Sequence, residues 1–227
     1  QSEIEARLHA AGAEFAVLAD AELVETVADD IARERVVGWF QGRMEFGPRA
    51  LGNRSILADP RSRDMQTTLN LKVKFRESFR PFAPSILRNR LEEWFALDCD
   101  SPYMLLIADV LAERRLAVSE GADELFGIER LKGARSEVPA VTHVDYSARI
   151  QTVGPETNPR YHELLTAFEQ RTGCPILINT SFNVRDEPIV CSPEDAFRCF
   201  MKTGIDSLAV GNCYLRKEEQ RPVPEKG

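Results

Sequence analysis

The sequence predicts an α/β fold whose strands form a mostly parallel or mixed open sheet. Three observations lead to this prediction. Short apolar runs of strand length recur along the 227 residues, segments with helical spacing of apolar residues lie between them, and the transitions carry turn or capping residues. This length allows one large α/β domain or two small ones.

The first expected pair of elements is a helix followed by a strand. Residues 20–35 repeat apolar side chains at three- and four-residue intervals, and Asp20 stands where an N-cap is expected. Residues 36–40 form a short apolar run without helical spacing. We therefore expect a helix over 20–35 that leads directly into a strand over 36–40.

Two prolines shape the prediction for the next segment. Residues 62–73 have helical spacing, whereas residues 79–85 contain Pro81 and Pro84. Proline lacks the backbone N–H and fixes φ, so we expect residues 79–85 to form neither a central helix nor a central strand. A helix is expected over residues 86–95.

The middle of the chain has weaker patterns. Residues 104–110 are apolar enough for a buried strand, and residues 141–145 and 148–153 read as two strands or one interrupted strand. Residues 111–139 are charged and weakly patterned, which predicts a long and flexible excursion.

Two helices near the C-terminus have explicit boundary signals. Residues 159–172 are helical in spacing and end before Gly173, which suits a left-handed C-terminal cap. A second helix over residues 192–203 begins with Ser192 as N-cap, followed by proline and two acids. The remaining expected elements are a buried strand over 175–178, a polar segment over 179–183, and a closing strand over 207–215.

Composition excludes several classes of protein. Five cysteines without CxxC spacing and three histidines without HxxxH or HExxH spacing argue against a disulfide framework, a zinc ribbon or a metal site built by this chain alone. No apolar run reaches the roughly 18 residues of a membrane span, and no signal peptide is visible. We expect a cytoplasmic protein with no membrane association.

Charge is unevenly distributed although the net charge is only −7. Residues 1–36 contain nine acids and three bases, whereas residues 43–90 contain eleven bases and four acids. A nucleic-acid-binding domain usually has a pI above about 9, but the pI of this chain is near 5.2. A local basic patch in an acidic protein therefore favours a small polyanion, such as a nucleotide or an acyl phosphate.

The most informative segment is the Gly/Arg turn, defined as residues 42–55. It places Arg43, Arg49 and Arg54 among three glycines and Pro48. Glycine lets the backbone approach a ligand closely, and the guanidinium fork matches phosphate or carboxylate oxygens. These features predict an anion pocket, although a flexible surface loop has the same composition.

Two further segments and one arginine supply candidate ligand groups. Residues 72–81 are basic, and residues 179–183 present amide and hydroxyl groups at the end of an expected strand, where open α/β sheets bind ligands. Arg149 lies within an apolar run. Each feature has an ordinary alternative: a solvated helical face, an Asx/Ser turn and a surface arginine, respectively.

These motifs together resemble a known family. The sequence GRMEFGPRALGNRSI over residues 42–56, with KFRESFRPFAP over 74–84, PILINTSFN over 175–183 and DSLAVG over 206–211, is similar to the C-terminal domain of the O-carbamoyltransferases. That family includes the nodulation-factor, cephamycin and aminoglycoside carbamoyltransferases. The resemblance covers nearly the whole chain and is weakest over residues 111–138.

The resemblance implies a YrdC/Sua5-like fold, in which a twisted open mixed sheet with helices surrounds an electropositive cavity. It implies that the domain binds ATP and carbamoyl phosphate and forms carbamoyl adenylate. A separate N-terminal actin-like domain then transfers the carbamoyl group to a hydroxyl of a sugar-containing acceptor. The metal ligands and the iron belong to that N-terminal domain, which this chain lacks, and Mg²⁺ is expected here only as a companion of ATP.

The family's site residues correspond to positions within the matching motifs of this sequence. The resemblance implies catalytic roles for Arg49, Lys74 and Arg80. The expected nucleotide- and carbamoyl-binding residues are Arg49, Arg54, Lys74, Arg80, Arg149, Asn179, Ser181 and Asn183. Chemistry of this kind needs positioned cations more than a protein nucleophile, because charge builds up on phosphoryl oxygens.

The expected organisation is a helical, linker-proximal segment over residues 1–35, the YrdC-like domain over 36–217 and a polar tail over 218–227. Because the chain opens with Gln1, we expect a piece of a longer polypeptide. Two alternatives stay open: a nucleotide-binding module that is inactive without its N-terminal partner, and an RNA-binding module, against which the acidic N-terminus argues. The carbamoyl acceptor and the oligomeric state stay open as well.

Overall fold

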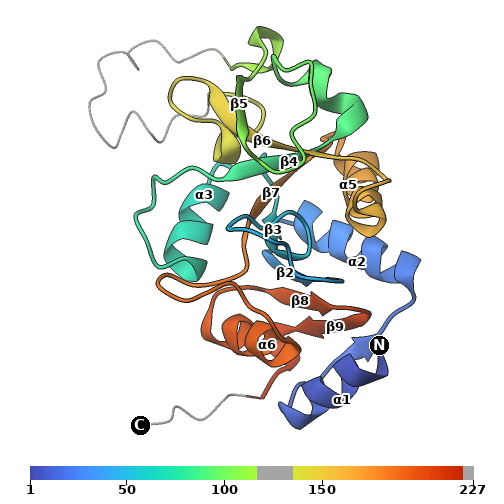
Figure 1. The fold of residues 1–227 in the computed structure, drawn as a ribbon. Helices are drawn as coiled ribbons and strands as arrows, with labels where there is room; N and C mark the ends of the chain where they lie inside the picture. Colours follow the sequence, from blue (N-terminus) through green and yellow to red (C-terminus); the bar gives the residue numbers. More distant parts are fainter. Residues whose placement is uncertain (117–134, 222–227) are drawn as a thin grey trace.

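The computed structural model describes residues 1–116 and 135–221, and a mixed β-sheet forms its centre (Figure 1). Nine strands of this described part make one sheet, with two parallel pairs and otherwise antiparallel neighbours. In spatial order the strands are β1 (Ala16–Val17), β9 (Cys213–Arg216), β8 (Ser207–Val210), β2 (Val37–Phe40), β3 (Arg54–Ala58), β7 (Ile176–Ser181), β4 (Ala83–Leu87), β6 (Ser147–Val153) and β5 (Leu106–Asp109).

Helices cover both faces of the sheet. Figure 1 shows α2 and α5 together on one face and α3 and α6 on the other. The helical elements are α1 (Ser2–Ala10), α2 (Asp20–Ala32), α3 (Met65–Thr68), α5 (Pro159–Thr172) and α6 (Pro193–Lys202), a π-helical turn η1 (Leu69–Val73), and the 3₁₀ turns η2 (Arg88–Glu93), η3 (Ala112–Arg114), η5 (Pro139–Val141) and η6 (Lys217–Glu219).

The core lies between the sheet and these helices. Strand β2 is buried at all four of its residues, because helices pack on both faces of the sheet there. Large fully buried side chains come from every layer: Trp39 from β2, Tyr161 and Phe168 from α5, Phe182 after β7 and Phe200 from α6.

Several expected elements are confirmed. The helix expected over 62–73 is present as α3 and η1, and the strand over 36–40 is β2. Gly173 caps α5 with φ of 73°. Ser192 and Asp195 form a reciprocal capping box at the start of α6, which local sequence signals predicted.

The prediction for residues 79–85 was wrong. Pro84 lies inside β4, which sits between β7 and β6 near the middle of the sheet. Pairing of β4 with β6 begins only at Ser85, so Pro84 has a neighbouring strand on one side alone. Such an edge-like position tolerates the missing N–H. The helix expected from residue 86 instead begins at Arg88 as a 3₁₀ turn.

Other boundaries also differ from expectation. The strand expected over 104–110 is β5, which lies at the edge of the sheet and exposes three of its four residues. The closing strand is two antiparallel strands, β8 and β9, because Gly211 adopts φ of 56° and turns the chain between them. Residues 141–145 form no strand, and β7 continues beyond residue 178 through Ser181.

Some elements near the N-terminus were not expected from the sequence pattern. Elements α1, β1 and β3 were not predicted, and the N-cap of α2 is Ala19, with Asp20 in the first turn. Of the excursion expected over 111–139, residues 117–134 lie outside the described residues. Strand β1 pairs with β9, so the N-terminal segment contributes an edge of the sheet.

Candidate functional site

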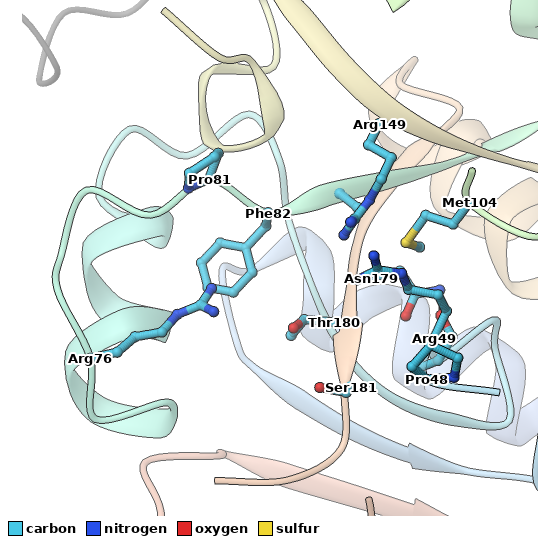
Figure 2. Close-up of a pocket in the computed structure, with 12 residues that line it drawn as sticks. Pro48, Arg49, Arg76, Pro81, Phe82, Met104, Arg149, Asn179, Thr180 and Ser181 are labelled. Atoms are coloured by element: carbon cyan, nitrogen blue, oxygen red, sulfur yellow. The ribbon is translucent and has the colours of Figure 1, made fainter. Parts of the chain in front are cut away.

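A pocket of about 150 Å³ opens where six parts of the chain meet (Figure 2). Its walls come from the Gly/Arg turn, the segment after η1, the start of β4, the segment before β5, β6 and the end of β7. Twelve residues line it: Pro48, Arg49, Ala50, Arg76, Pro81, Phe82, Ala83, Met104, Arg149, Asn179, Thr180 and Ser181.

The charge of this pocket is entirely positive. Three of the lining residues are arginines and none is acidic. Within the described part of the chain, neither Arg49 nor Arg149 forms an ion pair, and the Nε of Arg149 is buried without a hydrogen-bond partner. Burial, and secondarily the nearby charge of Arg49, lowers the pKa of Arg149. The two guanidiniums therefore give the pocket donors and positive charge suited to an anion.

Arg76 faces the pocket from the opposite wall (Figure 2). Its Nε donates a hydrogen bond of 2.6 Å to Asn70 Oδ1, and its guanidinium lies 4.9 Å from the centre of the Phe82 ring. Burial, followed by the charge of Arg80, lowers the pKa of Arg76. Arg76 belongs to the basic segment 72–81 but is not among the site residues predicted from the sequence. Its position between Lys74 and Arg80 was the available signal.

Lys74 lies beside the pocket and ties η1 to the end of β7. It is 4% exposed, and its Nζ donates to both the carbonyl and the side-chain oxygens of Ser181 and Asn183. Burial, followed by the charge of Arg76, lowers the pKa of Lys74 to about 7. Lys74 therefore fixes the position of Ser181, which itself lines the pocket.

A buried amide network holds the Gly/Arg turn against the sheet. Asn179 Nδ2 donates to the Ala50 carbonyl at 3.1 Å and to Gln151 Oε1 at 2.8 Å. Gln151 Nε2 in turn donates to the Leu51 carbonyl at 2.8 Å, and Ser85 Oγ donates to Gln151 Oε1 at 2.6 Å. Because both carbonyls follow Arg49 directly, this network sets where the Arg49 backbone lies.

Glu45 braces the same turn from its other side. Its Oε1 accepts hydrogen bonds from the backbone N–H groups of Leu51 at 2.7 Å and Asn53 at 2.8 Å. Gly52 lies between them with φ of 109°, in close contact with the ring of Tyr161. A side chain at this position would collide with that ring, which explains the glycine.

The predicted site residues therefore divide into two groups. Arg49, Arg149, Asn179 and Ser181 line one pocket, and Lys74 contacts Ser181 from beside it. The other three lie outside the lining: Arg54, Arg80 and Asn183.

Each of these three has another contact. The Arg54 guanidinium donates to the carbonyls of Gln41, Gly42 and Asn53, and it stacks 3.5 Å above Phe40. Arg80 is exposed, and its Nη1 lies 3.9 Å from Glu77 Oε2. Asn183 Oδ1 accepts hydrogen bonds from Lys74 Nζ at 2.8 Å and Ser181 Oγ at 2.7 Å, and its Nδ2 donates to the Glu187 carbonyl at 2.9 Å. All eight site assignments stay predictions, including those of the residues that line the pocket or lie beside it.

The family can be identified at this point, because the residues of the pocket fall within one family match. The family described as "Carbamoyltransferase C-terminus" matches residues 28–217. The chain belongs to this family.

Three relatives show how far the similarity extends. A Synechocystis protein of unassigned function is 60% identical over 88% of this chain and 33% of its own length. The nodulation protein NolO of Bradyrhizobium diazoefficiens is 44% identical over 86% of this chain and 33% of its own length. The 3'-hydroxymethylcephem-O-carbamoyltransferase of Amycolatopsis lactamdurans is 38% identical over 83% of this chain and 32% of its own length. The chain thus spans about a third of the length of these relatives.

A crystal structure of full-length HypF in its phosphate- and nucleotide-bound form overlaps 91% of this chain and 22% of its own, with 13% identity and a TM-score of 0.47. This overlap is too slight to support a functional argument. Among residues 1–116 and 135–221, no helix combines the length and apolar character needed to span a bilayer. The same residues contain no group of three His, Cys, Asp or Glu side chains placed to hold a metal ion.

Proposed function

We propose that this chain is the carbamoyl-activating part of a longer carbamoyltransferase, and that it uses ATP and carbamoyl phosphate to make carbamoyl adenylate. The observation that carries the proposal is the pocket in which Arg49 and Arg149 face the same space without a carboxylate partner in the described chain. Membership of a carbamoyltransferase family supports a carbamoyl-transfer role, and the greater length of the relatives supports a longer polypeptide.

The reaction has two steps. Water cleaves carbamoyl phosphate into carbamate and phosphate. A carbamate oxygen then forms a bond to the α-phosphorus of ATP, while the bond from that phosphorus to the α–β bridging oxygen breaks and pyrophosphate leaves. Both steps gather negative charge, so preorganised cations lower the barrier without a protein nucleophile.

The residues of the pocket have matching roles in this proposal. Arg49 and Arg149 bind phosphoryl or carbamoyl oxygens directly, and Arg76 closes the opposite wall. Lys74 acts by positioning Ser181. Losing one charge-assisted hydrogen bond of this kind costs about 1.5–3 kcal/mol.

The size of the pocket limits which part of the substrates it encloses. Its volume of about 150 Å³ is below the roughly 300–1,000 Å³ of pockets that enclose drug-sized ligands. We propose that carbamoyl phosphate, or the reacting end of the nucleotide, occupies the pocket, and that the adenosine lies outside it. The donor groups that line the pocket do not fit a protein-held Mg²⁺, which needs oxygen ligands such as carboxylates.

A second candidate is a nucleotide-binding module that turns over only within the longer polypeptide. The observation that favours it is the length of the relatives, of which this chain spans about a third. In either case the partners are ATP, carbamoyl phosphate and an N-terminal domain of the same polypeptide, which would hold the iron and the acceptor.

Pyrophosphate exchange separates these candidates. The 227-residue chain is mixed with ATP, carbamoyl phosphate and labelled pyrophosphate, and label entering ATP is measured. Carbamoyl-dependent exchange that Arg149→Met abolishes and Arg198→Met preserves supports carbamoyl-adenylate formation. Nucleotide binding by calorimetry without exchange supports the second candidate. If the chain shows no nucleotide binding and no exchange, both candidates are refuted.

A further inference from the structure

Strand β5, at one end of the sheet, carries exposed apolar side chains (Figure 1). Leu105 and Ile107 are 70% and 63% exposed, and Tyr103 just before them is 66% exposed. Leu106, between the first two, is exposed as well. Soluble domains seldom expose several large apolar side chains next to one another, and a patch of this kind usually marks an interaction surface. These four residues are called the β5 surface below.

The backbone of β5 is open on its outer side. The Val110 N–H donates to the Tyr146 carbonyl at 2.9 Å, toward β6. On the opposite side of the strand, the Asp109 carbonyl accepts from the Ala96 N–H at 2.8 Å. Successive residues of an antiparallel strand direct their backbone groups to opposite sides, so the N–H and C=O of Ile107 point outward, as those of Asp109 do. Within residues 1–116 and 135–221, no backbone group outside the β5–β6 pair bonds to Ile107.

The two edges of the sheet differ in how they are protected. At the other edge, β1 is only two residues long, and a strand this short leaves few groups for a foreign strand to pair with. Strand β5 has four residues, without proline or lysine. Its single charged residue, Asp109, lies at the end where Ala96 already pairs. An edge that stays this apolar is normally covered by another part of the protein.

The relatives favour one occupant for the β5 surface, which is the remainder of a longer polypeptide. The chain spans about a third of the length of these relatives, so about two thirds of such a polypeptide lies outside it. The matching family is described as the C-terminus of the carbamoyltransferases, which makes that remainder N-terminal. Interfaces between domains of one polypeptide often contain apolar surface that an isolated domain would expose.

The location of the β5 surface is set by its register with β6. Ile107 pairs with Arg149, and directly opposite side chains of an antiparallel pair lie on the same face of the sheet. Met104, within the same short segment, lines the pocket together with Arg149 (Figure 2). The β5 surface therefore borders the pocket and is separate from the pocket's own lining.

We propose that the β5 surface is the docking surface for the N-terminal part of the longer polypeptide. An extended apolar segment of that part adds a strand to the outer side of β5, where its backbone pairs with the N–H and C=O of Ile107. Its side chains pack on Leu105 and Ile107. The inference rests on the proposed function only in treating this chain as part of a longer polypeptide.

Hydrogen exchange tests the proposal without any variant. The exchange rate of the Ile107 N–H is measured in the 227-residue chain and in the full-length polypeptide. Pairing with a docked strand should slow this exchange by about tenfold or more in the full-length polypeptide. Leu105→Lys in the full-length polypeptide should return the Ile107 N–H to the rate of the 227-residue chain. Leu71→Lys is the matched control, because Leu71 is an exposed apolar residue on η1, and it should keep the protection.

The possible outcomes separate this proposal from its alternatives. Equal exchange of the Ile107 N–H in the two proteins would overturn it. Association of the 227-residue chain that depends on its concentration and is abolished by Leu105→Lys, without protection in the full-length polypeptide, would assign the surface to a second copy instead. Carbamoyl-dependent pyrophosphate exchange by the same preparations reports on the proposed function, so its presence without protection of Ile107 would remove only the docking assignment.

Discussion

Replacing Arg149 with methionine should stabilise the free chain and weaken anion binding. Arg149 is partly buried in the pocket wall, its Nε has no partner in the described chain, and the charge of Arg49 lies nearby. The lowered pKa of Arg149 shows that its surroundings disfavour the charged form. A buried donor without a partner lowers the stability of the free chain, and this cost is typical of residues held ready for a ligand.

The magnitudes follow from these contacts. A buried donor without a partner costs about 1–3 kcal/mol, so Arg149→Met should raise the free energy of unfolding by about 1 kcal/mol after loss of side-chain packing is included. A charge-assisted hydrogen bond to an anion contributes about 1.5–3 kcal/mol, so the dissociation constant for carbamoyl phosphate should rise about tenfold to 150-fold.

Urea denaturation and calorimetry measure the two effects on the same preparations. Arg198→Met is the control, because Arg198 is exposed on α6 and already paired with Asp195. It makes the same change in charge and should leave phosphate binding unchanged. The reasoning would be refuted by an Arg149→Met chain that binds carbamoyl phosphate as tightly as the wild type, or that unfolds at a clearly lower urea concentration.

Three further predictions concern Lys74 beside the pocket, Gly52 in the Gly/Arg turn and the N-cap of α6. The pKa of Lys74 is lowered to about 7, so the unfolded state binds more protons between pH 7 and about 10.5, and wild-type stability should rise with pH there. In Lys74→Met this pH-dependent contribution to the free energy of unfolding should vanish. If urea denaturation gives the same change in stability from pH 7 to 10 for both chains, the lowered pKa of Lys74 is contradicted. Gly52→Ala should destabilise the chain by about 2–4 kcal/mol, since φ is 109° and the new Cβ would lie 2.4 Å from the Tyr161 ring; a melting temperature equal to that of the wild type would show that this contact is wrong. Ser192→Ala should lose about 1 kcal/mol with its capping hydrogen bond to the Asp195 N–H, measured by thermal unfolding, whereas Ser192→Thr should retain most of it.

Local signals explain why part of the fold was predictable. The helix that begins after Ser192 and the helix that ends at Gly173 are set by capping groups within a few residues of their ends. Strand β2 was predictable because a strand covered on both faces is apolar throughout. The position of Pro84 was not, because whether a proline is tolerated depends on where the neighbouring strand begins, and that strand is distant in the sequence.

For the candidate site, the sequence by itself determined the kind of chemistry. It supplied arginines on a glycine-rich turn and an amide at the end of an apolar strand, and those residue types indicate anion binding. Tertiary structure decided which of the cations face one pocket. Arg49 and Arg149 meet there, whereas the Arg54 guanidinium is held by backbone carbonyls and Arg80 lies in solvent. The position of a long arginine side chain depends on the hydrogen-bond acceptors and the free volume around it. Both are supplied by segments that are distant in the sequence and meet only in the folded chain.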